Sequence, residues 1–139
     1  MTREMFHAQL DELGDDLEAM CTRVARAMGA ATRAMVAGDV RLAEQVIAGD
    51  SEIDADRARC EQRAVVLLAL QAPVARDLRT VVSLIQVAEH LERMGDLARH
   101  VTEVVRRQHP DPVAPRSCSG VSPRWAGWAN GSRGTCARR

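Results

Sequence analysis

The sequence predicts an all-α fold, an antiparallel three-helix bundle over residues 1–109, followed by a disordered tail over residues 110–139. Apolar residues recur every three or four positions through three long segments, which is the period of a buried helix face. Only two short breaks, at residues 38–39 and 71–73, separate these segments. Three long helices joined by short connections must run up, down and up, with their apolar faces together.

The first helix is expected over about residues 4–36. Gly38 then supplies a stop signal, and Asp39 is a suitable N-cap for the next helix. The apolar face of the first helix is formed by Phe6, Leu10, Leu13, Leu17, Met20, Val24, Met28, Ala31 and Met35.

The second helix is expected over about residues 40–70. The sequence Gly49-Asp50-Ser51 could interrupt it, but Val46 and Ile53 on either side are one heptad apart, so we expect the helix to continue. Its apolar face is formed by Leu42, Val46, Ile53, Cys60, Ala64 and Leu67.

The third helix is expected to begin at Pro73, because a proline in the first turn lacks only an N–H that would have no partner there. Its main apolar stripe consists of Leu84, Val87, Leu91, Met94, Ala98, Val101 and Val105. A second stripe beside it consists of Val74, Leu78, Val81, Ile85 and Ala88.

The second stripe continues into carboxylates at Glu92 and Asp96, with Glu89 on the same side. Glu92 and Asp96 are four residues apart, and like charges at this spacing cost about 0.2–0.5 kcal/mol. Two interpretations remain open at this point. Neighbouring cationic side chains can offset the acids on a solvated face, or the oxygens can hold a hard cation. The cationic candidates are Arg93, Arg99 and His100.

The formal net charge of zero conceals an uneven distribution. Residues 1–111 hold 14 Arg and all 19 acidic residues, a net charge of −5, whereas residues 112–139 hold five Arg and no acid. An acidic body argues against a nucleic-acid-binding surface there. The longest apolar run, residues 64–70, is too short to span a bilayer, and the start resembles no signal peptide, so we expect a cytoplasmic chain. Cys21 and Cys60 are expected to be buried thiols.

The segment PVARDLRTVVSLIQVAEHLERMGDLARHV resembles the third-helix signature of the PhoU family, the regulators of phosphate uptake. FHAQLDELGDDLEAM and GDVRLAEQVIAGDSEID resemble the first two helices of the same family. Members have two tandem three-helix repeats, and this chain resembles only the first. We therefore hypothesise that the unrelated tail is an out-of-frame or truncated sequence.

The resemblance implies a non-enzymatic regulator that couples the phosphate ABC transporter to its sensor histidine kinase. Such a protein represses phosphate-starvation genes when phosphate is plentiful, and it approaches the membrane only through its partners. The family also binds clustered metal ions through an acidic motif. The resemblance places this motif at Glu92 and Asp96, with Glu89 and Asp50 as additional candidates from position, for iron, zinc or magnesium ions.

Two other classes of function compete with this expectation. A di-metal enzyme needs two ExxH pairs on facing helices, whereas the only such pair here is Glu4 and His7, at the terminus. A structural or metal-binding bundle without regulatory activity is the other alternative. We also expect self-association, because the second stripe of the third helix (Val74, Leu78, Val81 and Ile85) lacks an evident cover.

Overall fold

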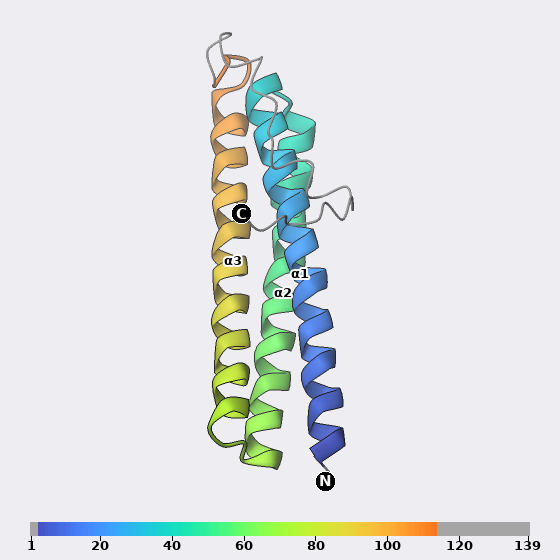
Figure 1. The fold of residues 1–139 in the computed structure, drawn as a ribbon. Helices are drawn as coiled ribbons and strands as arrows, with labels where there is room; N and C mark the ends of the chain where they lie inside the picture. The colour runs from blue at the N-terminus through green and yellow to red at the C-terminus, as the bar shows by residue number, and fades with distance from the viewer. Residues whose placement is uncertain (1–2, 114–139) are drawn as a thin grey trace, which may run out of the picture.

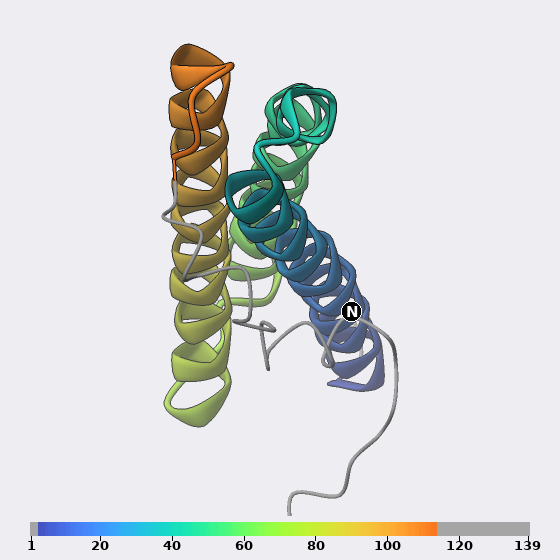
Figure 2. The ribbon, with the colours of Figure 1, turned by 90° about the horizontal axis from the view of Figure 1, so that it is seen from above.

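A computed structural model describes residues 3–113, and over that range it contains three helices. They are α1 (Arg3–Ala37), α2 (Val40–Gln71) and α3 (Arg76–Gln108). The helices run up, down and up (Figure 1), and each packs against both others, so they form a bundle and not a single layer (Figure 2). The predicted three-helix bundle is confirmed. The predicted tail lies almost entirely outside the described residues and stays a prediction.

The turn between α1 and α2 forms as the sequence predicts. Gly38 has a φ of +66°, a conformation that glycine adopts without steric cost. The Leu42 amide donates a hydrogen bond of 3.1 Å to Oδ1 of Asp39, which caps the first turn of α2. The helix then continues through Gly49, also as predicted.

The prediction that Pro73 begins the third helix is wrong, because α3 begins at Arg76. Ala72 adopts a left-handed conformation with a φ of 40°, and its amide donates to the Leu68 carbonyl at 3.2 Å, which ends α2. Ala75 also has a positive φ, of 51°. The residues around the proline are therefore used to reverse the chain direction between two antiparallel helices.

The buried face of α3 is rotated relative to the stripe expected from apolar residues alone. Val87, Met94 and Val101, which were expected in the core, are exposed. Gly95 and Thr102, which no apolar pattern would include, are buried instead. The buried residues of α3 are Val81, Ala88, Leu91, Gly95, Ala98, Thr102 and Val105.

Close packing explains both unexpected core positions. A Cβ atom added to Gly95 would lie 2.9 Å from Cδ1 of Ile53, so glycine lets α2 and α3 approach closely. The Thr102 hydroxyl donates to carbonyl oxygens of its own helix, at 3.2 Å from Ala98 and 2.8 Å from Arg99. Its polar group is therefore satisfied without water.

Two further expectations about burial need correction. Val81 is fully buried and Ile85 packs against the core, whereas Val74 and Leu78 are exposed, so only the beginning of the second stripe of the third helix lacks cover as expected. Cys21 is exposed, whereas Cys60 is buried as predicted. Burial raises the pKa of the Cys60 thiol, and the nearby carboxylates of Asp16 and Asp56 add to this shift.

Candidate functional site

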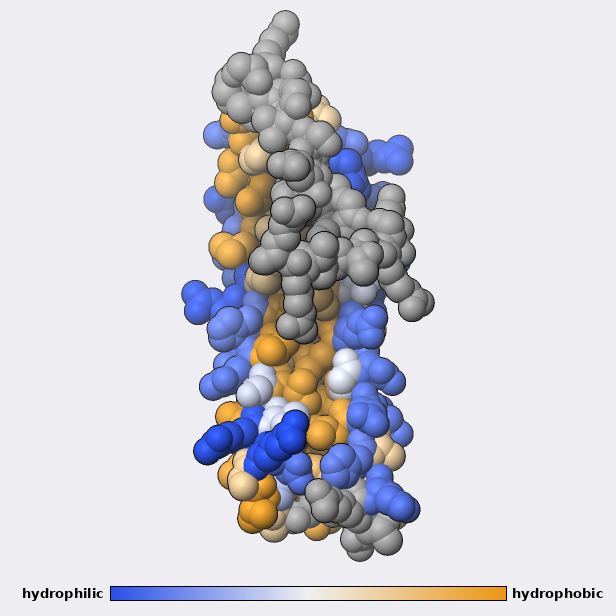
Figure 3. Space-filling view, viewed as in Figure 1, coloured by the Kyte–Doolittle hydropathy of each residue, from blue (hydrophilic) through white to orange (hydrophobic). Residues whose placement is uncertain are grey.

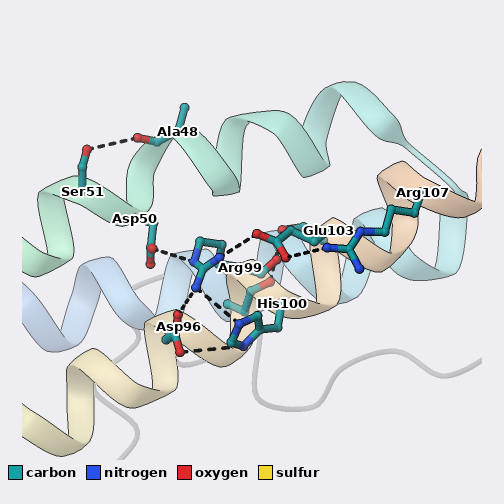
Figure 4. A network of polar contacts seen from close by, with 10 residues as sticks. Ala48, Asp50, Ser51, Asp96, Arg99, His100, Glu103 and Arg107 are labelled. Atoms are coloured by element: carbon teal, nitrogen blue, oxygen red, sulfur yellow. Dashed lines mark hydrogen bonds and ion pairs between the residues drawn. The ribbon is translucent and has the colours of Figure 1, made fainter.

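The largest polar cluster between α2 and α3 is centred on the guanidinium of Arg99 (Figure 4). Its Nε lies 2.8 Å from Oδ2 of Asp50 on α2. One Nη atom donates to Oε1 of Glu103 at 2.6 Å, and the other donates to Oδ1 of Asp96, both on α3. One arginine thus joins three carboxylates from two helices.

A second layer of weaker contacts surrounds this cluster. Nδ1 of His100 lies 3.7 Å from the second oxygen of Asp96, and Arg107 lies 3.6 Å from the second oxygen of Glu103. Both partners follow the i,i+4 spacing that places side chains side by side on a helix. The cluster therefore follows α3 for about three turns, from Asp96 to Arg107, and reaches across to α2 at Asp50 alone.

The electrostatics of the cluster depend on how far each group is buried. Burial raises the pKa of Asp50 above 3.8, and the negative charges of Asp54 and Asp96 raise it further, while Arg99 opposes the shift. The hydrogen bond to Asp96 raises the pKa of Arg99 above its ordinary value. Arg99 is therefore a permanent cation between carboxylates.

The four predicted metal ligands are not brought together equally. Asp50 and Asp96 converge from two helices, but on Arg99, which occupies the position of a cation between them. Glu92 is partly buried and Glu89 is exposed, and neither belongs to the network around Arg99. Within residues 3–113, no three acidic, histidine or cysteine side chains are arranged to hold a metal ion. The metal site stays a prediction.

Sequence reasoning missed the bridging role of Arg99. The spacing of Asp96, Arg99 and Glu103 could have revealed the part of the cluster within one helix. The pairing with Asp50 depends on the register between α2 and α3, which no local pattern specifies.

A second ion-pair cluster, also missed, joins α1 to α2. The carboxylate of Asp56 is buried, with only 5% of its side chain exposed. It accepts a hydrogen bond from Nε of Arg23 on α1 at 2.8 Å and another from Arg59 on its own helix. Arg23 also pairs with Glu52. Because the buried acid is doubly paired, it does not remain as an uncompensated charge.

A cavity of about 430 Å³ lies further along the junction of α1 and α2. The guanidinium of Arg63 at its wall already pairs with Glu12 at 3.3 Å and Asp16 at 3.2 Å. Arg59 is engaged by Asp56. The lining is completed by Gln9, Gln62, Val66 and Leu67. Because its arginines are already paired, this cavity has little free positive charge for an anionic ligand.

Fold and polar clusters together define an all-α bundle protein whose charged groups are arranged in ion-pair networks. The family model described as the PhoU domain matches residues 17–105, which include most of α1, all of α2 and most of α3. The chain belongs to the PhoU family.

Several curated proteins are similar to this chain. The phosphate-specific transport system accessory protein PhoU homolog 1 of Mycobacterium leprae is 48% identical over 118 residues, covering 85% of this chain and 53% of the relative. PhoU homolog 2 of Mycobacterium tuberculosis is also 48% identical, with 85% and 55% covered. The PhoU homolog of Aquifex aeolicus is 37% identical over 95 residues, with 68% and 43% covered.

The chain thus spans about half the length of the curated relatives it matches. No solved structure matches the chain. None of the helices within residues 3–113 combines the length and the apolar character that crossing a membrane requires.

Proposed function

We propose that this chain is a non-enzymatic, cytoplasmic regulator of phosphate uptake. The observation that carries the proposal is the match of the PhoU domain to residues 17–105, which coincides with the helical bundle. The names of the relatives, which describe accessory proteins of the phosphate-specific transport system, support the same role. Because the chain spans only part of those relatives, this role is proposed for the bundle itself.

The partners proposed are the phosphate ABC transporter and its sensor histidine kinase. Contact with both would keep the phosphate-starvation response repressed while phosphate is plentiful, and would bring the chain to the membrane only through its partners. An acidic face suits such contacts because complementary charge guides association and selects partners. Glu89 and Glu92 are the candidates, since both stand beside the Arg99 network without being neutralised by it.

The test is a phosphate-starvation reporter in a bacterial host that lacks its own PhoU-family proteins. Expression of the full chain is expected to lower reporter activity at high phosphate. The charge reversal Glu89→Arg/Glu92→Arg should weaken this repression. The matched control is Asp15→Arg/Glu18→Arg, which reverses two acids at the same spacing on an exposed part of α1 and should leave repression intact.

Two results would contradict the proposal. The first is an unchanged reporter although the folded chain accumulates, as judged by its helical circular dichroism. The second is an equal loss of repression in the Glu89→Arg/Glu92→Arg variant and in the control. This result would show that Glu89 and Glu92 have no specific part in partner contact. Capture of the transporter by the wild-type chain but not by Glu89→Arg/Glu92→Arg would support the specific partner.

A second proposed property is weak binding of iron, zinc or magnesium ions by Asp50, Asp96, Glu92 and Glu89. The convergence of Asp50 and Asp96 on the cationic Arg99 favours it. Because the guanidinium competes for the same oxygens, Arg99→Gln is expected to raise Mg²⁺ or Zn²⁺ affinity several-fold in calorimetric titration. Asp50→Asn/Asp96→Asn should abolish the binding. Equal affinities in wild type and both variants would contradict this site.

A further inference from the structure

Large apolar side chains are exposed on α3 where it borders α1. Their spacings of seven, three, four and three residues place them on one side of the helix, away from the Arg99 cluster. One ionisable side chain, the exposed His90, lies among them. Figure 3 shows an apolar band along this side, with polar residues on both sides of it. The apolar residues are Val87, Met94, Leu97, Val101 and Val104.

On the α1 side, small residues border the same junction. The ion pairs that α1 makes to α2 come from one flank of its buried face, at Asp16 and Arg23. The opposite flank, which turns toward α3, contains Gly14, Cys21 and Ala25. A Cβ atom added to Gly14 would meet nothing within 4 Å. The surface made by these small residues and the apolar side chains of α3, called the α1/α3 face, is therefore shallow on its α1 side.

Carboxylates border the α1/α3 face on the outer side of α1. Asp11, Asp15 and Glu18 are exposed, and no ion pair within residues 3–113 includes any of them. Glu18 is nearest to the face, because it lies four residues after Gly14 on the same side of the helix. The face thus combines an apolar centre with a negatively charged border.

We propose that the α1/α3 face binds residues 114–139 of the same chain through Trp125 and Trp128. These are the two tryptophans of the sequence. Their indole rings would cover Met94 and Leu97 and fill the space above the small residues of α1. Tryptophan suits such a site because it buries a large apolar area, and a methionine sulfur packs favourably against an aromatic ring.

The charge of residues 114–139 complements that of the bundle. This segment holds five arginines and no acidic side chain, whereas residues 1–111 carry a net charge of −5. Arg124 directly precedes Trp125, so an indole on the apolar centre would bring a guanidinium to the border near Glu18. Complementary charge of this kind guides and selects a contact. The segment has too few apolar residues to order itself, and the face would supply the apolar area it lacks.

The described chain turns back onto the bundle just before this segment begins. α3 ends at Gln108, and Val113 packs against a cluster that contains Ala34 and Val105. From Val113 to Trp125 there are 12 residues, and a flexible chain of that length spans about 20 Å on average. The 11 residues of helix between Met94 and Val105 measure about 16 Å. The centre of the face is therefore within reach of Trp125.

The test is the intrinsic fluorescence of the full chain, which reports on residues 114–139 alone because the sequence has no tyrosine and no other tryptophan. Acrylamide quenching is expected to be several-fold weaker in the folded wild type than in the chain unfolded by guanidinium chloride, and the folded chain should emit at shorter wavelength. This protection should be the same from nanomolar to tens of micromolar protein, because the contact lies within one chain.

Three variants locate the contact. Leu97→Arg places a positive charge in the apolar centre and should raise quenching to the level of the unfolded chain. Glu18→Arg should raise it in part, because it repels Arg124. The matched control is Leu70→Arg on α2, where the leucine is 62% exposed, similar to the 58% of Leu97, but lies outside the face. This control should keep the protection of wild type.

The opposite results overturn the proposal. Equal quenching of the folded and the unfolded wild type would show that the tryptophans do not dock. Protection that develops only at high protein concentration would assign them to a contact between chains. Equal protection in the Leu97→Arg and Leu70→Arg variants would place the contact elsewhere. Circular dichroism of both variants should match wild type, and if Leu97→Arg unfolds the chain, Met94→Gln provides the same comparison with a smaller change.

Discussion

The α1/α2 junction and the outer surface of α3 near α1 belong to the same bundle but use opposite chemistry. At the first, Arg23 and Arg59 enclose the buried carboxylate of Asp56. At the second, Leu97 and its apolar neighbours face outward, and no ion pair among the described residues crosses between the helices. Ion pairs specify which helices lie side by side within the chain, whereas an apolar surface is free to pack against another molecule. The difference separates residues that maintain the fold from residues available for contact.

The largest effect is expected where two helices approach most closely. In Gly95→Val the new side chain would meet Ile53, since even a Cβ atom would lie 2.9 Å from its Cδ1. Overpacking of this kind should lower the free energy of unfolding by about 3 kcal/mol. The control Gly14→Val, where an added Cβ atom would meet nothing within 4 Å, should change it by less than about 0.5 kcal/mol. Urea denaturation measures the free energy of unfolding of both variants. Equal losses in Gly95→Val and Gly14→Val would contradict a close approach of α2 and α3 at Gly95.

A smaller loss is expected at the buried ion pair. Asp56→Ala removes the acceptor of hydrogen bonds from Arg23 and Arg59, and should lower the free energy of unfolding by about 1–2 kcal/mol. The loss is limited because both arginines can turn toward water. Glu52→Ala removes an exposed partner of the same Arg23 and should cost about 0.5 kcal/mol or less. Chemical denaturation measures both variants. A larger loss of unfolding free energy in Glu52→Ala than in Asp56→Ala would contradict the greater contribution expected of the buried carboxylate.

The smallest effect is a pH dependence at the α2/α3 junction. Because the folded-state pKa of Asp50 is raised, ionisation is less favourable in the fold than in the unfolded chain. Below pH 3.8 the acid is mostly protonated in both states. As the pH rises through the folded pKa, wild type should lose stability relative to Asp50→Asn, and the difference should then become constant. A difference that changes in the opposite direction would show that the ion pair with Arg99 outweighs burial.

The sequence was sufficient to predict the fold because its helix boundaries carry local signals. Gly38 and Asp39 determine one turn through backbone conformation and capping, and both act as expected. Pro73 correctly indicated a boundary between two helices, but the start predicted for α3 was three residues too early. A proline is tolerated both in a turn and in the first turn of a helix, so local rules could not distinguish the two.

The surfaces were harder to predict than the helices. A pattern based on apolar residues assigned Met94 to the core and overlooked Gly95, although close approach of α2 requires the glycine. It also expected the whole stripe from Val74 to Ile85 to lack cover, whereas Val74 is exposed and Val81 is buried. Contacts such as that of Arg99 with Asp50 depend on the register between two helices, and helix periodicity carries no information about register.

Capture of the phosphate transporter tests the central claim, regulation through partner contact, most directly, because Glu89 and Glu92 stand beside the Arg99 network without being neutralised by it. In extract of phosphate-replete bacteria, the wild-type chain and the Asp15→Arg/Glu18→Arg variant should retain the transporter equally, and Glu89→Arg/Glu92→Arg should retain several-fold less. Equal retention by all three folded chains, or retention by none of them, would contradict the proposed contact.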